Sequence, residues 1–262
     1  MIDQLPLLTV LLLCLVALAA GWIDSVVGGG GVIQLPALFI GLPSSTPVAT
    51  VSGTNKLSSV VGTAMASATY VSKIKIHWPT ALAVVVTAYG GSTLGATLVR
   101  FIPRTAFSPI IVVIVAVVGV YTWRRPKLGE TTSLRHHGVS HWLIALAIGA
   151  VIGVYDGMVG PGTGVFLTIA FVALLGYGFL EATTMAKLAN LTTNIAALVV
   201  FGFSGQILWL LGGCMAVCNL TGAAIGSRMA IKHGNRFIRS VFLIALIIVE
   251  AKLIYDMIML YI

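Results

Sequence analysis

Two aspartates, Asp24 and Asp156, each precede a run of glycines in closely similar sequences. Residues 21–31 read Gly-Trp-Ile-Asp-Ser-Val-Val-Gly-Gly-Gly-Gly, and residues 153–164 read Gly-Val-Tyr-Asp-Gly-Met-Val-Gly-Pro-Gly-Thr-Gly. Both lie in strongly apolar stretches, where a charged residue is costly and usually functional. Because apolar surroundings favour the protonated form of a carboxyl group, both aspartates are candidate proton-coupling residues. The alternative is that each one only neutralises a buried lysine.

The glycine runs themselves are candidate anion-binding sites. Glycines interrupt a helix and expose backbone N–H groups, which need a partner inside a membrane. The N-terminus of the short helix that follows carries a partial positive charge. The alternative is tight helix packing, which we expect for Gly91, Gly95, Gly222 and Gly226. The candidate ligand-binding residues of the two runs are Gly28, Gly29, Gly30, Gly31, Gly160, Gly162, Thr163 and Gly164.

Two lysines, Lys56 and Lys187, lie within long apolar stretches. A lysine at the centre of a membrane helix costs about 2.5–3.5 kcal/mol, so each needs a partner. Each lysine could reach the membrane interface, pair with Asp24 or Asp156, or bind a substrate anion. We favour the anion, because each lysine heads a stripe of polar residues that supply mainly hydrogen-bond donors. The candidate substrate-binding side chains are Lys56, Lys187, Asn55, Ser59, Thr63, Asn190 and Asn194.

The chain is an internal duplication. Besides the two aspartates, Lys56 matches Lys187 and Trp78 matches Trp209 in the same order. An ordered match of several residue types indicates repeated units rather than chance. We therefore predict a first repeat over residues 1–123, a linker over 124–140 and a second repeat over 141–262.

The composition requires a membrane environment. Hydrophobic residues make up 58% of the 262 residues and charged residues 8%, with a mean hydropathy of +1.06. That leaves too little polar surface for a soluble globule. We predict an all-α polytopic membrane protein of about eight to ten segments, with two broken or re-entrant helix pairs. The expected segments are 5–20, 32–40, 48–70, 78–101, 106–123, 165–175, 180–203, 206–229 and 237–258, with a leading segment of the second repeat that ends at Asp156.

The basic residues predict opposite orientations for the two repeats. The linker carries four basic residues and should face the cytoplasm. In the first repeat Lys73 and Lys75 mark the loop before residue 78 as cytoplasmic, whereas the equivalent loop around Ser204 has no base. The loop from Arg228 to Arg239 reverses this asymmetry. The pattern predicts an inverted-topology repeat, typical of secondary transporters, with both termini periplasmic or extracellular.

Several other functions are disfavoured. The net charge of +8 is explained by topology, and no basic run accompanies a soluble domain, so we expect no nucleic-acid partner. No nucleophile–base set is visible, so we expect no enzyme activity. None of the histidines has metal-ligand spacing with Cys or Asp, so we predict no metal and no cofactor. The three cysteines, Cys14, Cys214 and Cys218, are expected to pack as small apolar residues. The alternative for Cys214 and Cys218, which share a helix face at i, i+4, is a redox or sulfur-handling pair.

The chain resembles the TauE/SafE family of sulfite exporters, also called the 4-toluene sulfonate uptake permease family. The resemblance covers nearly the whole chain. The residues that carry it are Ile23-Asp24-Ser25 with Gly28 to Gly31 and Pro36, Thr54-Asn55-Lys56-Leu57, Tyr155-Asp156-Gly157 with Gly160-Pro161-Gly162-Thr163-Gly164, and Ala186-Lys187-Leu188 with Asn190 and Asn194. It implies export or uptake of sulfur-containing anions such as sulfite, sulfonates or thiosulfate. The first glycine run lacks Pro and Thr, so the two sites need not contribute equally.

The sequence therefore predicts a multi-pass transporter of the bacterial inner membrane. It would move a small organic or inorganic sulfur anion with proton coupling, by rocking one half against the other. The rivals are a passive anion channel and a structural membrane protein. The expected partners are the anion, protons and the lipid bilayer, and a homo-oligomer is left open.

Overall fold

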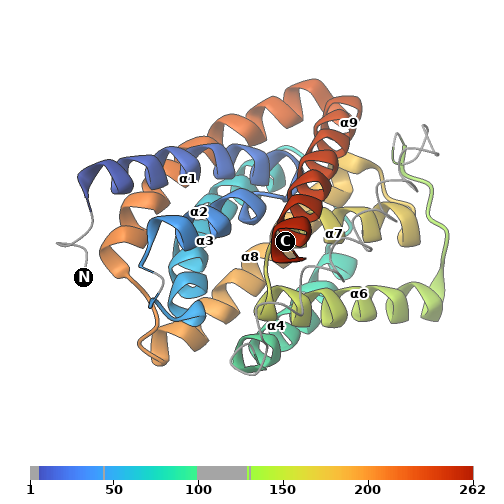
Figure 1. The fold of residues 1–262 in the computed structure, drawn as a ribbon. Coiled ribbons are helices and arrows are strands. Elements are labelled where there is room, and N and C mark those ends of the chain that lie inside the picture. Colours follow the sequence, from blue (N-terminus) through green and yellow to red (C-terminus); the bar gives the residue numbers. More distant parts are fainter. Residues whose placement is uncertain (1–5, 44, 99–128, 130, 262) are drawn as a thin grey trace.

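The computed structural model describes residues 6–43, 45–98, 129 and 131–261, with the backbone alone at residues 242 and 245–261. This part of the chain contains helices and loops but no β-strand, as expected (Figure 1). The elements are α1 (Leu7–Val27), α2 (Gly31–Gly41), α3 (Val48–Val71), α4 (Trp78–Leu98), α6 (Gly138–Met158), α7 (Thr163–Ala170), the π-helical turn η4 (Phe171–Leu175), α8 (Phe179–Phe203) and α9 (Trp209–Tyr261).

Five of these helices are long and apolar enough to cross a membrane. They are α1, α4, α6, α8 and the part of α9 from Trp209 to Val241. Helix α3 has 24 residues and is therefore about 36 Å long, but it carries the polar stripe headed by Lys56. The prediction of an all-α polytopic membrane protein is confirmed.

Most expected segments coincide with helices, and three differ. The first was expected to end at Ala20, but α1 continues to Val27 and so includes Asp24. The last two segments form one element, α9, interrupted at Gly234, which has φ 70° and ψ −162°. The expected linker ends later than the structure allows, because α6 already begins at Gly138. The segment 106–123 lies outside the described residues.

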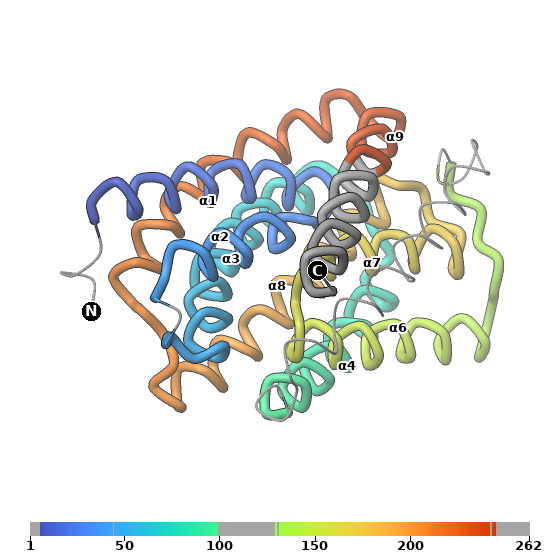
Figure 2. Tube along the Cα trace, viewed as in Figure 1, coloured from blue at the N-terminus to red at the C-terminus, as the bar shows by residue number. Residues whose placement is uncertain are grey.

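Two short helices follow the glycine runs, as predicted. Helix α1 ends at Gly28, whose φ of 92° is a left-handed conformation that favours glycine, and α2 begins three residues later. In the second copy, Gly160 and Gly162 have φ of 85° and 82°, and α7 begins directly after them. The course of the chain through both breaks can be followed in Figure 2. Each break therefore gives the short helix that follows it an N-terminus of its own.

The long helices pack mainly between the two predicted repeats. Helix α1 lies along α9, and α6 lies along α4 (Figure 1). Between these two pairs lie α3, which packs on α9, and α8, which packs on α4 and α3. The contacts thus occur in corresponding sets, as related halves would make. In the part of the chain that the structure describes, helices of the two predicted repeats therefore interleave instead of forming separate bundles.

Glycines permit the closest of these contacts. A Cβ atom at Gly91 or Gly95 on α4 would overlap backbone atoms of α6, and one at Gly222 or Gly226 on α9 would overlap backbone atoms of α1. The prediction that these four glycines serve helix packing is confirmed. Close backbone approach of this kind is how small residues hold membrane helices together. The α1–α9 pair and the α4–α6 pair thus lie on either side of α3 and α8, which carry the two lysines.

Candidate functional site

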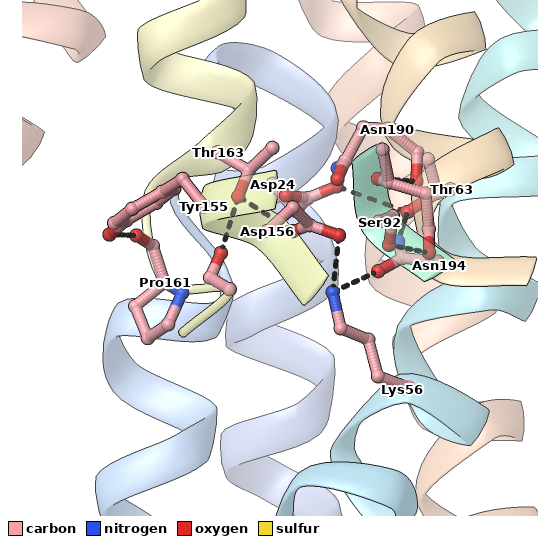
Figure 3. A network of polar contacts seen from close by, with 12 residues as sticks. Asp24, Lys56, Thr63, Ser92, Tyr155, Asp156, Pro161, Thr163, Asn190 and Asn194 are labelled. Atoms are coloured by element: carbon pink, nitrogen blue, oxygen red, sulfur yellow. Dashed lines mark hydrogen bonds and ion pairs between the residues drawn. The ribbon is translucent and has the colours of Figure 1, made fainter. Parts of the chain in front are cut away.

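Lys56 of α3 forms an ion pair with Asp156 of α6. Its Nζ lies 2.6 Å from Oδ2 of Asp156 and donates a second hydrogen bond, of 2.9 Å, to Oδ1 of Asn194 (Figure 3). The other carboxylate oxygen of Asp156 accepts a hydrogen bond of 2.6 Å from the hydroxyl of Thr163. The side chains of Lys56 and Asp156 are only 6% and 1% exposed. Burial of these charges is tolerated because each is paired and hydrogen-bonded.

Lys187 of α8 forms the second ion pair, with Asp24 of α1. The distance from its Nζ to Oδ2 of Asp24 is 3.1 Å, and Nζ also donates to the backbone carbonyl oxygen of Asp24. The hydroxyl of Thr63 lies 3.4 Å from the same carboxylate oxygen and links it to the amide of Asn194. Asp24 is 16% exposed, whereas Lys187 is 1% exposed.

The two pairs are reciprocal. The lysine of each predicted repeat is bound by the aspartate of the other repeat. Of the three alternatives for the lysines, an extension to the membrane interface is wrong, because both side chains are buried. The ion pair is present at both positions. Anion binding is a further role that these pairs neither require nor exclude, and it stays a prediction.

The two glycine breaks contact each other beside these ion pairs. A Cβ atom at Gly28 would overlap the backbone of Gly164, and Gly31 lies next to Pro161. A Cβ atom at Gly160 would lie 3.4 Å from Nζ of Lys56. Packing is thus one function of Gly28 and Gly164. The second break, at Gly160, also lies next to the ammonium group of Lys56.

A small pocket lies where α3, α8 and the breaks meet. It has about 20 Å³ of space for water-sized molecules, and about 280 Å³ when the open space at its mouth is counted. Its lining consists of polar or charged side chains and glycines: Asp24, Gly28, Gly31, Asn55, Lys56, Ser59, Asp156, Gly160, Gly162, Thr163, Gly164, Asn190 and Asn194. Most predicted site residues are therefore brought together from six helices and two breaks. Four of them do not line the pocket: Lys187, Thr63, Gly29 and Gly30.

The four residues outside the pocket have other contacts. Lys187 and Thr63 donate hydrogen bonds to the carboxylate of Asp24, which does line the pocket. Gly30 packs against α1, where a Cβ atom would overlap the carbonyl oxygen of Ala20. Gly29 faces Ile23 and Val165. These positions shape the site without reaching its interior.

Three residues that the sequence analysis gave no role in the site support it, although Tyr155 belongs to one of the motifs that carry the resemblance. The hydroxyl of Tyr155 donates to the carbonyl oxygen of Pro161 at 2.6 Å and so holds the second break. Tyr70 donates to the carbonyl oxygen of Ser25, next to Asp24, at 2.9 Å. Ser92 of α4 donates to the carbonyl oxygen of Thr193 at 2.8 Å, behind the stripe on α8. No sequence spacing marks these roles, because each partner is a backbone oxygen, which any residue type supplies.

Comparisons with known proteins agree with the resemblance. The family model for the sulfite exporter TauE/SafE matches residues 13–253. The probable membrane transporter protein YfcA of Escherichia coli (strain K12) is 35% identical over 242 residues, which is 92% of this chain and 88% of that protein. A probable membrane transporter protein of Haemophilus influenzae is 34% identical over 249 residues, which is 95% of each chain. No solved structure matches the chain significantly. The chain therefore belongs to the TauE/SafE sulfite exporter family of membrane transporters.

Proposed function

We propose that this protein is a proton-coupled secondary transporter of small sulfur oxyanions, with sulfite and thiosulfate as the first candidates. The observation that carries the proposal is the chemistry of the pocket. Lys56 supplies a positive charge, and the amides, hydroxyls and glycine backbone around it supply hydrogen-bond donors. The N-terminus of α7 borders the same space and favours negative charge.

The lining favours inorganic anions over sulfonates with an organic tail. Ligand sites for organic molecules are lined mainly by apolar and aromatic side chains. In this pocket the described lining contains no apolar side chain. A sulfonate tail would therefore lie against charged and amide groups, which lose their hydration without gaining a partner. Sulfite and thiosulfate carry no such tail.

Charge balance supports proton coupling. The two lysines and two aspartates of the site already neutralise each other. An entering anion adds negative charge in a region of low dielectric constant, where uncompensated charge is costly. Protonation of one aspartate offsets a unit of this charge. Coupled entry of anion and proton is thus less costly than entry of the anion alone.

Alternating access would use the contact between the two breaks. Discontinuous helices that meet near the midplane are the usual substrate sites of transporters with inverted repeats. Here the breaks after α1 and α6 touch each other and border the pocket. A small shift between them would open the pocket to one side of the membrane or the other.

The test is uptake into proteoliposomes of labelled sulfite, thiosulfate, sulfoacetate and taurine, with and without a pH gradient. We expect thiosulfate or sulfite uptake that a pH gradient stimulates. Lys56→Ala should abolish it, whereas Lys73→Ala in the exposed loop after α3 should not. Anion uptake at the same rate with and without the pH gradient would indicate a passive channel. A folded protein without any anion flux would indicate a structural role and contradict the proposal.

A further inference from the structure

The two aspartates of the site differ in how completely they are bound. Both carboxylate oxygens of Asp156 are engaged, one by Lys56 at 2.6 Å and the other by Thr163 at 2.6 Å. For Asp24, every hydrogen bond from the described residues to the carboxylate goes to Oδ2, with Lys187 at 3.1 Å and Thr63 at 3.4 Å. Asp24 is 16% exposed and Asp156 only 1%. A proton can reach Asp24 without breaking a hydrogen bond.

The difference follows from the sequence at matched positions. When Asp24 is aligned with Asp156, Gly31 occupies the position of Thr163, so the first copy lacks the hydroxyl that binds the second carboxylate oxygen. When Lys56 is aligned with Lys187, Thr63 occupies the position of Asn194. The shorter side chain of Thr63 lies 3.4 Å from Asp24, whereas Asn194 lies only 2.9 Å from Lys56. The copies have therefore diverged at the residues that hold each ion pair.

The two lysines differ in a complementary way. Lys56 lines the pocket, and two of the three N–H donors of its ammonium group are used, by Asp156 and Asn194. No other described residue accepts its third donor, which can bind a ligand while the ion pair is intact. Lys187 does not line the pocket and is bound to the backbone carbonyl oxygen of Asp24 as well as to its carboxylate. It keeps the carbonyl partner whether or not the carboxylate carries a proton.

We propose that Asp24 alone binds the transported proton, while the Lys56–Asp156 ion pair stays intact and forms the anion-binding site. This assignment rests on the proposed transport function. In the proton step, a carboxylate oxygen of Asp24 gains H⁺ and the aspartate becomes neutral. The anion then compensates the positive charge left on Lys187. Lys187 is a positioning residue that holds Asp24 at the edge of the pocket.

The charged and titratable groups around Asp24 are few. Lys187 faces it from α8, Lys56 of α3 and Asp156 of α6 lie around the same pocket, and the buried Tyr70 of α3 is near enough to interact with it electrostatically. Helices α2 and α7 contain no charged residue. Among the described residues of α9, none forms an ion pair with Asp24. The two carboxylates, Asp24 and Asp156, are therefore the groups that matched variants must separate.

The experiment measures thiosulfate binding to purified protein from mildly acidic to mildly alkaline pH, because the charge of thiosulfate is constant over that range. For the wild type, affinity should fall about tenfold per pH unit once Asp24 loses its proton, as linkage to one proton requires. Asp24→Asn, which imitates the neutral acid, should bind thiosulfate with no pH dependence. Asp156→Asn, the matched control, should keep the pH dependence of the wild type, because Asp24 still gains and loses the proton.

A second measurement applies even if an asparagine variant does not fold. Infrared difference spectra should show the band of a protonated carboxyl group when thiosulfate binds. Asp24→Glu should shift this band, and Asp156→Glu should not. A band shifted only by Asp156→Glu, or wild-type pH dependence in Asp24→Asn, would overturn the assignment. Absence of thiosulfate and sulfite binding to the wild type at any pH would instead contradict the proposed transport function itself.

Discussion

Lys56 and Lys187 keep their charge inside an apolar helix bundle because each contacts an aspartate on another helix. A buried ion pair contributes little net stability, because desolvation offsets the attraction between the charges. Removal of one partner is costly, because it leaves the other charge buried alone. Net stability alone therefore does not explain two such pairs at the pocket, which agrees with the proposed role in ligand and proton binding.

At the residue scale, Thr163 offers a test of how firmly Asp156 is held. Thr163→Val keeps the shape of the side chain but removes the hydroxyl that donates to Asp156 at 2.6 Å. We expect the free energy of unfolding to fall by about 1.5–3 kcal/mol, the usual range for a hydrogen bond to a charged group. Reversible denaturation in detergent micelles measures this change. Thr163→Ser keeps the hydroxyl and should stay near the wild type, and equal losses in both variants would contradict the explanation.

At the scale of elements, the glycine breaks decide where the short helices begin. Gly28 ends α1 in a left-handed conformation and touches Gly164 at the start of α7. Both conditions exclude a side chain at Gly28. The N-termini of α2 and α7 depend on this contact for their position at the pocket.

Substitution of Gly28 by alanine should therefore be strongly unfavourable. Gly28→Ala introduces strain at positive φ and a steric overlap with Gly164, so we expect a loss of several kcal/mol in the free energy of unfolding or a failure to fold. Gly90→Ala on α4 is the matched control, because a Cβ atom there meets nothing within 4 Å. Alanine favours a helix over glycine by about 0.5–1 kcal/mol, so this variant should be slightly stabilised. Thermal unfolding followed by tryptophan fluorescence distinguishes the two.

At the scale of the whole molecule, the helices of the two repeats interleave. Helix α1 packs on α9 and α6 packs on α4, so two sequence halves cannot rock as separate bodies without breaking the most extensive contacts. The moving units would instead be mixed, with α1 and α9 in one and α4 and α6 in the other. The opposite orientation of the halves in the membrane stays a prediction from the basic loops.

Cysteine labelling tests that orientation directly. In a variant with the three native cysteines replaced by alanine, Ser72→Cys reports the loop after α3 and Ser204→Cys the loop after α8, both at exposed positions. The positive-inside rule places the loop beside Lys73 in the cytoplasm and the base-free loop outside. An impermeant maleimide added to intact cells should therefore label Ser204→Cys and not Ser72→Cys. Labelling of both from one side would exclude the inverted repeat.

Membership of the membrane class, the helix positions and the chemistry of the site were determined by the sequence. Apolar length predicts a membrane helix, as the agreement of α8 with the expected segment 180–203 illustrates. Every residue that lines the pocket belongs to the candidate site that the sequence predicted from the duplicated Asp, Lys and glycine pattern and the polar residues near it. These features are local, because they depend on residue type and spacing along one helix.

Only the tertiary structure decided which aspartate each lysine meets. The pairs join Lys56 to Asp156 and Lys187 to Asp24, across the two repeats, and no spacing along the chain encodes that choice. The tertiary structure also decided three further features of the site. Thr163 donates a hydrogen bond to Asp156, Asp24 is partly exposed, and Lys187 lies outside the pocket. The physical reason is that ion pairing between helices depends on their packing, which the glycine contacts of α1 with α9 and of α4 with α6 establish in three dimensions.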